Sequence, residues 1–192
     1  MGKVKYLVAI LILTGCGSVD CPSFPDEGLD WMPYVQGDNI SFSDGTDTSQ
    51  LNVYETHRTS YSYGKLLSHR ASCVVEAHAK LSSNSSLPQF NMYGNSYSAD
   101  LPRSYTINII DVNFNFTIYN YGVMVYNNNG LTCENITKFD NGFKEYVDVV
   151  KVAYDTLLYS ETPIYQVFLA KKVGVIQFKD RFDHKTWSLI GK

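Results

Sequence analysis

The sequence predicts an all-β fold, in which an antiparallel sheet forms a curved half-barrel, a barrel or a sandwich. Apolar and polar residues alternate along several segments, which is the pattern of half-buried strands. Asp-Gly and Asn-Gly pairs, which favour tight turns, lie among these segments. No segment after residue 15 shows the apolar spacing of a convincing helix, so few or no helices are expected there.

The first two strands are predicted on either side of an Asp-Gly turn. Residues 39–43 read Asn-Ile-Ser-Phe-Ser, in which polar and apolar side chains alternate. Asp44-Gly45 follows, and the alternation resumes at residues 51–54. We therefore expect a β-hairpin here.

Residues 73–81 give the clearest strand signal in the chain. One face is expected to be apolar and consists of Cys73, Val75, Ala77, Ala79 and Leu81. The opposite face carries Glu76, His78 and Lys80, together with Val74. This arrangement predicts a strand with one buried and one solvated side.

Residues 110–118 repeat the pattern with larger side chains. The side expected to face the core carries Ile110, Val112, Phe114, Phe116 and Ile118. The opposite side carries Asp111, Asn113, Asn115 and Thr117. We expect a single core strand over this range.

Five further segments are rich in β-branched and aromatic residues and complete a set of about nine strands. They are residues 121–126, 146–154, 164–170, 174–179 and 186–190. Residues 82–102 are rich in Ser, Asn, Gly and Pro and are expected to form a long loop. Residues 59–70 remain open between a short helical turn and a loop.

The first residues resemble an export signal. Lys3 and Lys5 precede the apolar run Leu7–Leu13, which is too short for a membrane-spanning helix of about 20 residues. Leu13-Thr14-Gly15-Cys16 then resembles the lipobox of bacterial lipoproteins. The resemblance implies cleavage before Cys16 and a lipid (palmitate-type) anchor on this cysteine.

Further along, the chain resembles lipoproteins of Gram-negative, Bacteroides-type bacteria. The matching residues are Trp31-Met32-Pro33-Tyr34, residues 37–42, residues 165–178 and Trp187-Ser188-Leu189. The resemblance implies an all-β domain outside the cytoplasm and no catalytic residues. A looser similarity is to the half-barrel of the periplasmic lipoprotein carrier and its outer-membrane receptor, which concerns the fold alone.

These observations predict three parts. They are a signal peptide at residues 1–15, a lipidated cysteine with a flexible tether at residues 16–30, and one β-rich domain at residues 31–192. Gly17, in place of the aspartate that retains lipoproteins at the inner membrane, favours the outer membrane; the leaflet stays open.

Cysteine usage predicts one disulfide in the exported domain. Cys21, Cys73 and Cys133 remain once Cys16 is assigned to lipid. The preferred pair is Cys73–Cys133, because both lie in the predicted folded region, and the other pairings stay open. The spacings do not suit a zinc site.

The sequence predicts no enzyme, metal or cofactor. The motifs G-x-S-x-G, G-x-x-x-x-G-K-[ST] and G-x-G-x-x-G are absent. His57, His69, His78 and His184 show no ligand spacing. The net charge of −3 and the pI near 5.8 argue against nucleic acid as a partner.

The expected function is therefore a membrane-anchored, non-enzymatic binding or scaffold domain, with a glycan, a protein or an apolar ligand as its partner. Several tyrosines lie near predicted loops and strand ends, where their rings either cap the edges of the β-domain, which is the preferred interpretation, or form a binding surface. They are Tyr61, Tyr63, Tyr93, Tyr97, Tyr105, Tyr119 and Tyr121. The alternative is a carrier or sensor that holds an apolar ligand in a half-barrel cavity.

Overall fold

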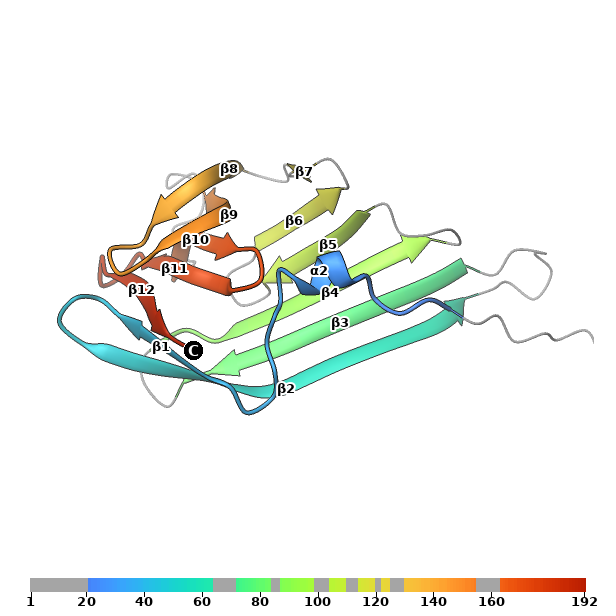
Figure 1. Cartoon of the computed structure of the whole chain (residues 1–192), viewed down its shortest axis with the longest axis horizontal. Helices are drawn as coiled ribbons and strands as arrows, with labels where there is room; N and C mark the ends of the chain where they lie inside the picture. Colours follow the sequence, from blue (N-terminus) through green and yellow to red (C-terminus); the bar gives the residue numbers. More distant parts are fainter. Residues whose placement is uncertain are drawn as a thin grey trace, which may run out of the picture.

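The computed structural model describes residues 21–63, 72–83, 87–98, 104–109, 114–119, 122–124, 130–154 and 163–192 (Figure 1). These ranges contain one four-residue helix, α2 (Asp26–Leu29), and twelve strands. The strands are β1 (Asn39–Ser43), β2 (Thr48–Tyr63), β3 (Ser72–Ser82), β4 (Phe90–Ser98), β5 (Ser104–Ile109), β6 (Phe114–Tyr119), β7 (Gly122–Met124), β8 (Leu131–Asp140), β9 (Glu145–Tyr154), β10 (Ile164–Ala170), β11 (Gly174–Asp180) and β12 (Thr186–Gly191). The predicted all-β, antiparallel fold is confirmed.

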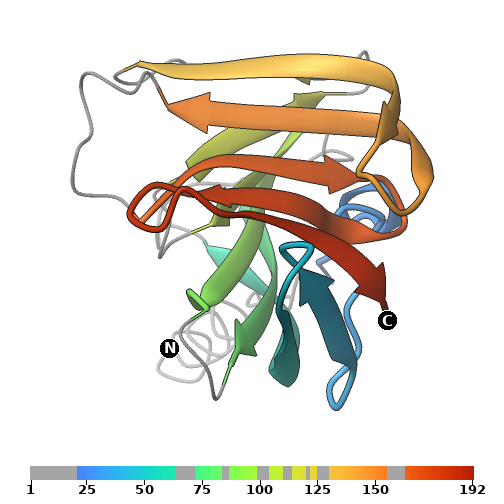
Figure 2. The same ribbon diagram turned by 90° about the vertical axis from the view of Figure 1, so that its left-hand side faces the viewer.

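All twelve strands belong to one sheet in the order β7-β6-β5-β4-β3-β2-β1-β12-β11-β10-β9-β8. β1 pairs with both β2 and β12, and so it joins the N-terminal strands to the C-terminal strands. The sheet curls into a half-barrel, with β8–β12 forming one wall and β1–β7 the other (Figure 2). No helix in the described ranges has the length and apolar character needed to cross a membrane.

Two of the turns predicted from Asp-Gly and Asn-Gly pairs are present, and residues 127–129 of a third lie outside the described ranges. Between β1 and β2, Asp44 Oδ1 accepts from the backbone N–H groups of Thr46 at 2.8 Å and Asp47 at 2.6 Å. Gly45 has a φ of 93°, which a residue with a side chain rarely adopts. Between β8 and β9, Gly142 has a φ of 91°. Each turn therefore combines a short polar side chain with a glycine.

The core lies between the two walls of the half-barrel. The predicted apolar face of β3 is buried, with Cys73, Val75, Ala77, Ala79 and Leu81 all at most 4% exposed. Glu76, His78 and Lys80 are only half-buried on the other face, as expected, although Val74 beside them is buried. From the opposite wall, Ile164, Val167, Leu169 and Phe178 join the same apolar cluster.

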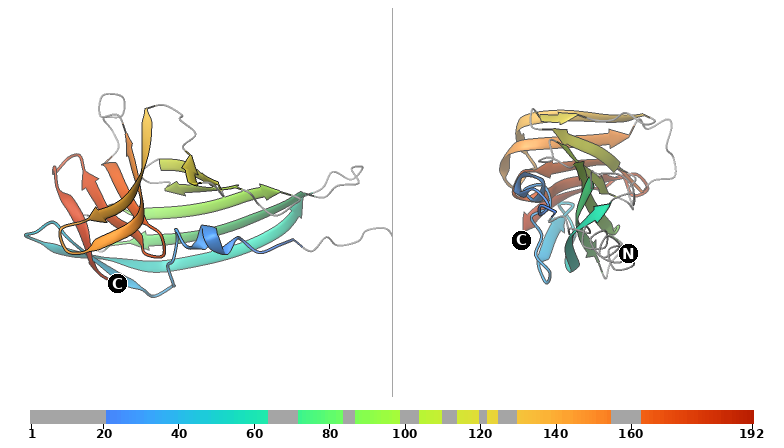
Figure 3. Two further views of the ribbon diagram at one scale, coloured as in Figure 1. Left: turned by 45° about the horizontal axis from the view of Figure 1, so that its top comes forward. Right: turned by 90° about the vertical axis from the view of Figure 1, so that its right-hand side faces the viewer.

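The segment expected to be a flexible tether is packed into this core from Cys21 onward (Figure 3). Phe24 and Met32 lie against β4 so closely that a Cβ built on Gly94 would be 2.7 Å from each side chain. Phe24 is 3% exposed and Met32 is 5% exposed. The tether prediction is therefore wrong for residues 21–30, because Phe24 is buried in the core and Cys21 is bonded to Cys73 on β3.

Two hydrogen bonds, one to a side chain and one to the backbone, fix the end of this segment to the opposite wall. The Val175 N–H donates to the Tyr34 hydroxyl at 2.7 Å, and the Lys172 N–H donates to the Asp30 carbonyl at 2.5 Å. A Cβ on Gly174 would collide with the Tyr34 hydroxyl, so β11 can begin there only with glycine. Burial raises the pKa of Tyr34 above its usual value, so its hydroxyl stays neutral.

Three strands were not predicted. β4 lies inside residues 82–102, which were expected to be a loop, and β5 and β8 also carried no recognised signal. Residues 59–63, left open between a helical turn and a loop, belong to β2. Residues 64–70 lie outside the described ranges.

The predicted strand over residues 110–118 is described only from Phe114, where β6 begins. β6 pairs antiparallel with β5, and Phe114 lies opposite Ile109. Residues 110–113 lie outside the described ranges, as do the side chains of β6. The predicted division of this strand into a core face and a solvent face therefore stays a prediction.

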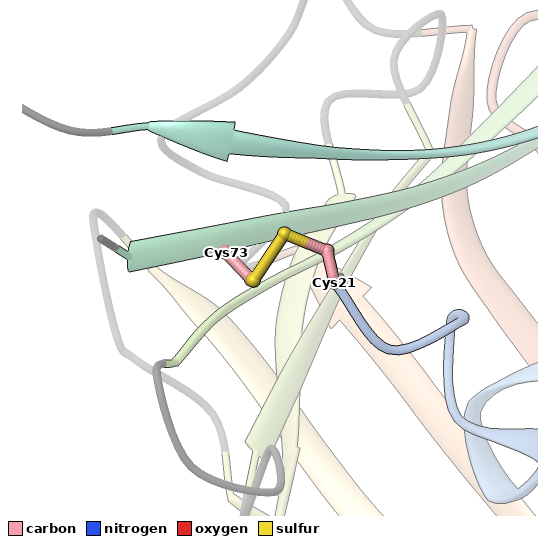
Figure 4. The surroundings of a disulfide bond; sticks show 2 residues. All are labelled: Cys21 and Cys73. Atoms are coloured by element: carbon pink, nitrogen blue, oxygen red, sulfur yellow. A yellow bond between two sulfur atoms is a disulfide. The ribbon is translucent and has the colours of Figure 1, made fainter. Parts of the chain in front are cut away.

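The disulfide joins Cys21 to Cys73, with a Cα–Cα distance of 5.5 Å (Figure 4). The preferred pair Cys73–Cys133 is therefore wrong. Cys21 is not in a free tether but lies beside the first residues of β3, where Cys73 points inward. Cys133 is on β8, which is far from β3 in the strand order.

Candidate functional site

The predicted lipidation site, Cys16, lies outside the described residues. Cys133 is a free, half-buried thiol. Burial raises its pKa to about 11, and the backbone hydrogen bond from Glu134 opposes this only in part. A thiol with a raised pKa is a poor nucleophile at neutral pH, so Cys133 does not form a reactive centre.

His78 and Lys80 converge on one carboxylate on the outer face of the sheet. Glu55 lies 2.9 Å from His78 Nε2 and 2.7 Å from Lys80 Nζ. Lys80, and then His78, lower the pKa of Glu55, and Glu55 raises the pKa of Lys80. Because the Lys80 ion pair and the contact with His78 both favour the ionised form of Glu55, this cluster is a surface polar network rather than a general acid–base site.

The other histidines do not assemble a metal centre in the described ranges. His57 lies opposite His78 on β2, and their ring centroids are 5.4 Å apart. His184 lies in an exposed turn with a φ of 53°, and His69 is outside the described residues. The described residues contain no group of three or more His, Cys, Asp or Glu side chains that could hold a metal ion.

The predicted tyrosine surface is described only in part. Tyr61 is 45% exposed, and its hydroxyl donates to Glu76 Oε1 at 3.1 Å. Tyr93 is half-buried. Tyr121 and the side chains of Tyr63, Tyr97, Tyr105 and Tyr119 lie outside what the structure describes. Tyr54, which was not in the predicted set, is 43% exposed on β2.

A polar groove lies where β1, β2 and the end of β3 meet, and it encloses about 570 Å³. This volume is in the range of small-molecule sites, about 300–1,000 Å³. Its described lining consists only of residues with amide or hydroxyl side chains. They are Asn39, Thr48, Ser49, Gln50, Asn52, Ser82 and Ser83, and together we call them the polar groove.

Strand register explains why the principal side chains of the polar groove face outward. Ile40 and Leu51 lie opposite each other and are buried, so their neighbours Asn39 and Asn52 lie opposite each other on the solvent side. Asn52 in turn lies opposite Ser82 on β3. Because side chains alternate along a strand, burying one set fixes the other on a single outer surface.

The amides of the polar groove retain much of their hydrogen-bonding capacity. Asn52 Nδ2 donates to Asn39 Oδ1 at 3.1 Å, and Gln50 Nε2 donates to Ser41 Oγ at 3.4 Å. All three amide side chains are exposed, and each primary amide has two N–H donors and an oxygen acceptor. The groove can therefore both donate and accept hydrogen bonds.

Charged residues flank the polar groove and are engaged with one another in ion pairs. At one end is the Glu55 network, and Tyr54 lies close enough to Lys80 to affect its pKa. At the turn between β1 and β2, Lys185 Nζ lies 2.6 Å from Asp44 Oδ2 and 3.2 Å from Asp47 Oδ2. The backbone N–H of Asp47, followed by Lys185, lowers the pKa of Asp44 to about 2.

The sequence predicts which side chains of this groove face outward, but it does not predict the groove itself. Polar residues alternate with apolar ones through residues 39–43 and 51–54, which predicted the two strands of a β-hairpin. The pattern could not show that the outward side chains line a hollow, because the hollow depends on how β1, β2 and β3 curve together. Comparison with protein families, curated proteins and solved structures finds no match to this chain.

Proposed function

We propose that this chain is an outer-membrane lipoprotein, anchored through Cys16, whose β domain works outside the cytoplasm as a non-enzymatic binding or scaffold domain. The observation that carries the proposal is the disulfide between Cys21 and Cys73. Disulfides persist in oxidising compartments and are rare in the cytosol. The charged, apolar and small-residue order that ends at Cys16 supports the same location.

The polar groove and the filled core support binding at the surface rather than in the interior. Phe24, Trp31 and Met32 occupy space between the walls of the half-barrel and belong to one continuous apolar cluster. A carrier of an apolar ligand needs an apolar cavity with few polar groups. The described interior gives no observation that favours this alternative, so we do not adopt it.

A non-enzymatic role is also consistent with two carboxylates that flank the polar groove. Asp44 and Glu55 each form an ion pair with a lysine, and both have a lowered pKa. A general acid needs a carboxyl group whose pKa is raised towards neutrality. The pKa of each of these two carboxyl groups is instead lowered.

The test of the anchor is the Cys16→Ser variant, expressed in a Gram-negative host that processes lipoproteins. We expect the wild-type chain in outer-membrane fractions of a sucrose gradient, because two or more acyl chains hold a protein stably on a bilayer. The variant should be soluble or unprocessed, whereas the matched variant Cys133→Ser should remain on the membrane. A Cys16→Ser protein that is processed and fractionates normally would refute the anchor, and wild-type protein only in inner-membrane fractions would refute the location.

A further inference from the structure

The chemistry of the polar groove narrows the class of ligand that it can hold. Its described lining has no charged side chain and no apolar one. A phosphate or carboxylate ligand would lack a cationic partner there, because Lys80 and Lys185 are engaged by Glu55, Asp44 and Asp47. A lipid chain would lack an apolar surface to cover it.

A neutral ligand with many hydroxyl groups fits this lining. Each hydroxyl of such a ligand donates one hydrogen bond and accepts others, and the exposed amides of Asn39, Gln50 and Asn52 offer both kinds of partner. Most small-molecule sites are mainly apolar. A groove of this volume with only amide and hydroxyl residues in its described lining therefore suits a sugar better than it suits an apolar molecule.

Tyr54 adds an aromatic surface beside the polar groove. It lies two residues after Asn52 on β2, and the residue is 43% exposed. A register shift between Val53 and Glu55 marks a bulge at this position. Tyr54 nevertheless keeps the outward side of the strand that Asn52 occupies, because Val53 between them is buried. A tyrosine ring has an apolar face that can cover the C–H face of a sugar ring and a hydroxyl that can bond at its rim.

The polar groove lies at the far end of the long strands from the disulfide. Cys73 is near the first residue of β3, and Ser82 is its last residue. At about 3.3 Å per residue, these two positions are roughly 30 Å apart. If Cys16 carries the lipid, the groove is therefore at the end of the domain that is more remote from the anchor.

We propose that the polar groove binds a neutral carbohydrate, with Asn39, Gln50 and Asn52 bonding its hydroxyl groups and Tyr54 covering one sugar ring. The proposal rests on the proposed binding function and specifies its ligand class. The recognition is non-covalent and involves no chemical step. Loss of one well-formed hydrogen bond or of the aromatic contact should weaken binding about tenfold.

The test uses the full lipidated chain in detergent on an array of neutral oligosaccharides of glucose, galactose, mannose and N-acetylglucosamine. Glycans that contain uronic acids or sulfate provide the charged comparison. Neutral glycans that bind are then titrated by calorimetry against the variants Asn52→Ala, Gln50→Ala and Tyr54→Ala. The matched variant is Asn135→Ala on β8, which is exposed and distant from the groove in the strand order.

We expect binding to at least one neutral glycan, about tenfold weaker binding by each groove variant, and unchanged binding by Asn135→Ala. No binding to any neutral glycan, a preference for the charged glycans, or equal binding by the groove variants and wild type would each overturn the proposal. Membrane fractionation of the same preparations separates the proposed membrane anchor from the proposed carbohydrate ligand. A chain that stays on the outer membrane but binds no sugar refutes only the carbohydrate proposal. A chain that is not anchored through Cys16 refutes the proposed function.

Discussion

At the residue scale, Asn141 connects the turn between β8 and β9 to β11 and β12 through hydrogen bonds. Its Nδ2 donates to the Ile176 carbonyl at 3.2 Å and to the Leu189 carbonyl at 2.9 Å. Its Oδ1 accepts from the N–H groups of Phe143 and Lys144, both at 3.0 Å. The side chain is 4% exposed and uses all of its polar atoms.

Replacing Asn141 should therefore destabilise the domain. Asn141→Ala leaves buried carbonyl groups without donors, and we expect a loss of about 1–3 kcal/mol in the free energy of unfolding. Asn141→Asp should be no better, because it keeps the acceptor but loses both donors. Urea denaturation measures the effect, with the exposed Asn52→Ala as the control, expected to stay within about 0.5 kcal/mol. If both alanine variants unfold at the wild-type urea concentration, this description of Asn141 fails.

The free thiol of Cys133 gives a second prediction at the residue scale. Because burial raises its pKa to about 11, little thiolate is present at pH 8 in the folded chain. Alkylation by iodoacetamide should be much slower in the native protein than in urea, where the pKa returns towards 9.0. The native rate should rise steadily as the pH is increased from 8 to 11. Equal rates at pH 8 in the native and denatured protein would show that Cys133 is not shielded.

At the scale of single elements, the disulfide holds the segment from Cys21 to Tyr34 in the half-barrel. It closes a loop with a sequence separation of 52 residues. In the chain-entropy treatment, a bond across this separation stabilises the fold by about 3–4 kcal/mol. We expect Cys21→Ser to lower the free energy of unfolding by about this amount, measured by urea denaturation without reductant. Cys133→Ser removes a cysteine but no bond, so a loss as large as that of Cys21→Ser would contradict the observed pairing.

Elements with a regular alternation could be predicted from the sequence, and elements held by tertiary contacts could not. β3 was predicted because five alternate residues are apolar. β4 was missed because Phe90, Met92 and Gly94 alternate within a stretch rich in Ser and Asn, and Gly94 is buried only because Phe24 and Met32 cover it. The sequence of residues 21–34 has no periodic pattern that would predict its packing against the sheet. The position of Cys21 beside Cys73, and therefore the disulfide, was missed for the same reason.

The candidate site also contains features that could be predicted from the sequence and features that could not. The outward residues of β1 and β2 followed from alternation, since Ile40, Phe42 and Leu51 had to face the core. The outward position of Tyr54 continues the same alternation, because Val53 before it is buried. The groove depends on the meeting of three strands, and it has no local sequence pattern that would have predicted it.

At the scale of the whole molecule, the disulfide shortens the connection between the proposed anchor and the domain. Five Cα–Cα steps separate Cys16 from Cys21, and they span at most about 18 Å. The first residues of β3 are therefore expected to stay close to the lipid surface, with the polar groove at the opposite end of the long strands. The anchor and the orientation of the groove therefore both depend on the cysteines, which are expected to be lipid-modified at Cys16, bonded between Cys21 and Cys73, and free at Cys133.

The most direct test of this account is mass-spectrometric mapping of all four cysteines in protein extracted from outer membranes without reductant. We expect a chain that begins at lipid-modified Cys16, with its N-terminal peptide linked through Cys21 to the peptide that contains Cys73. Cys133 should take up an alkylating label only after unfolding. A Cys73–Cys133 linkage with Cys21 free, or an unmodified Cys16 in a chain that retains residues 1–15, would contradict the account.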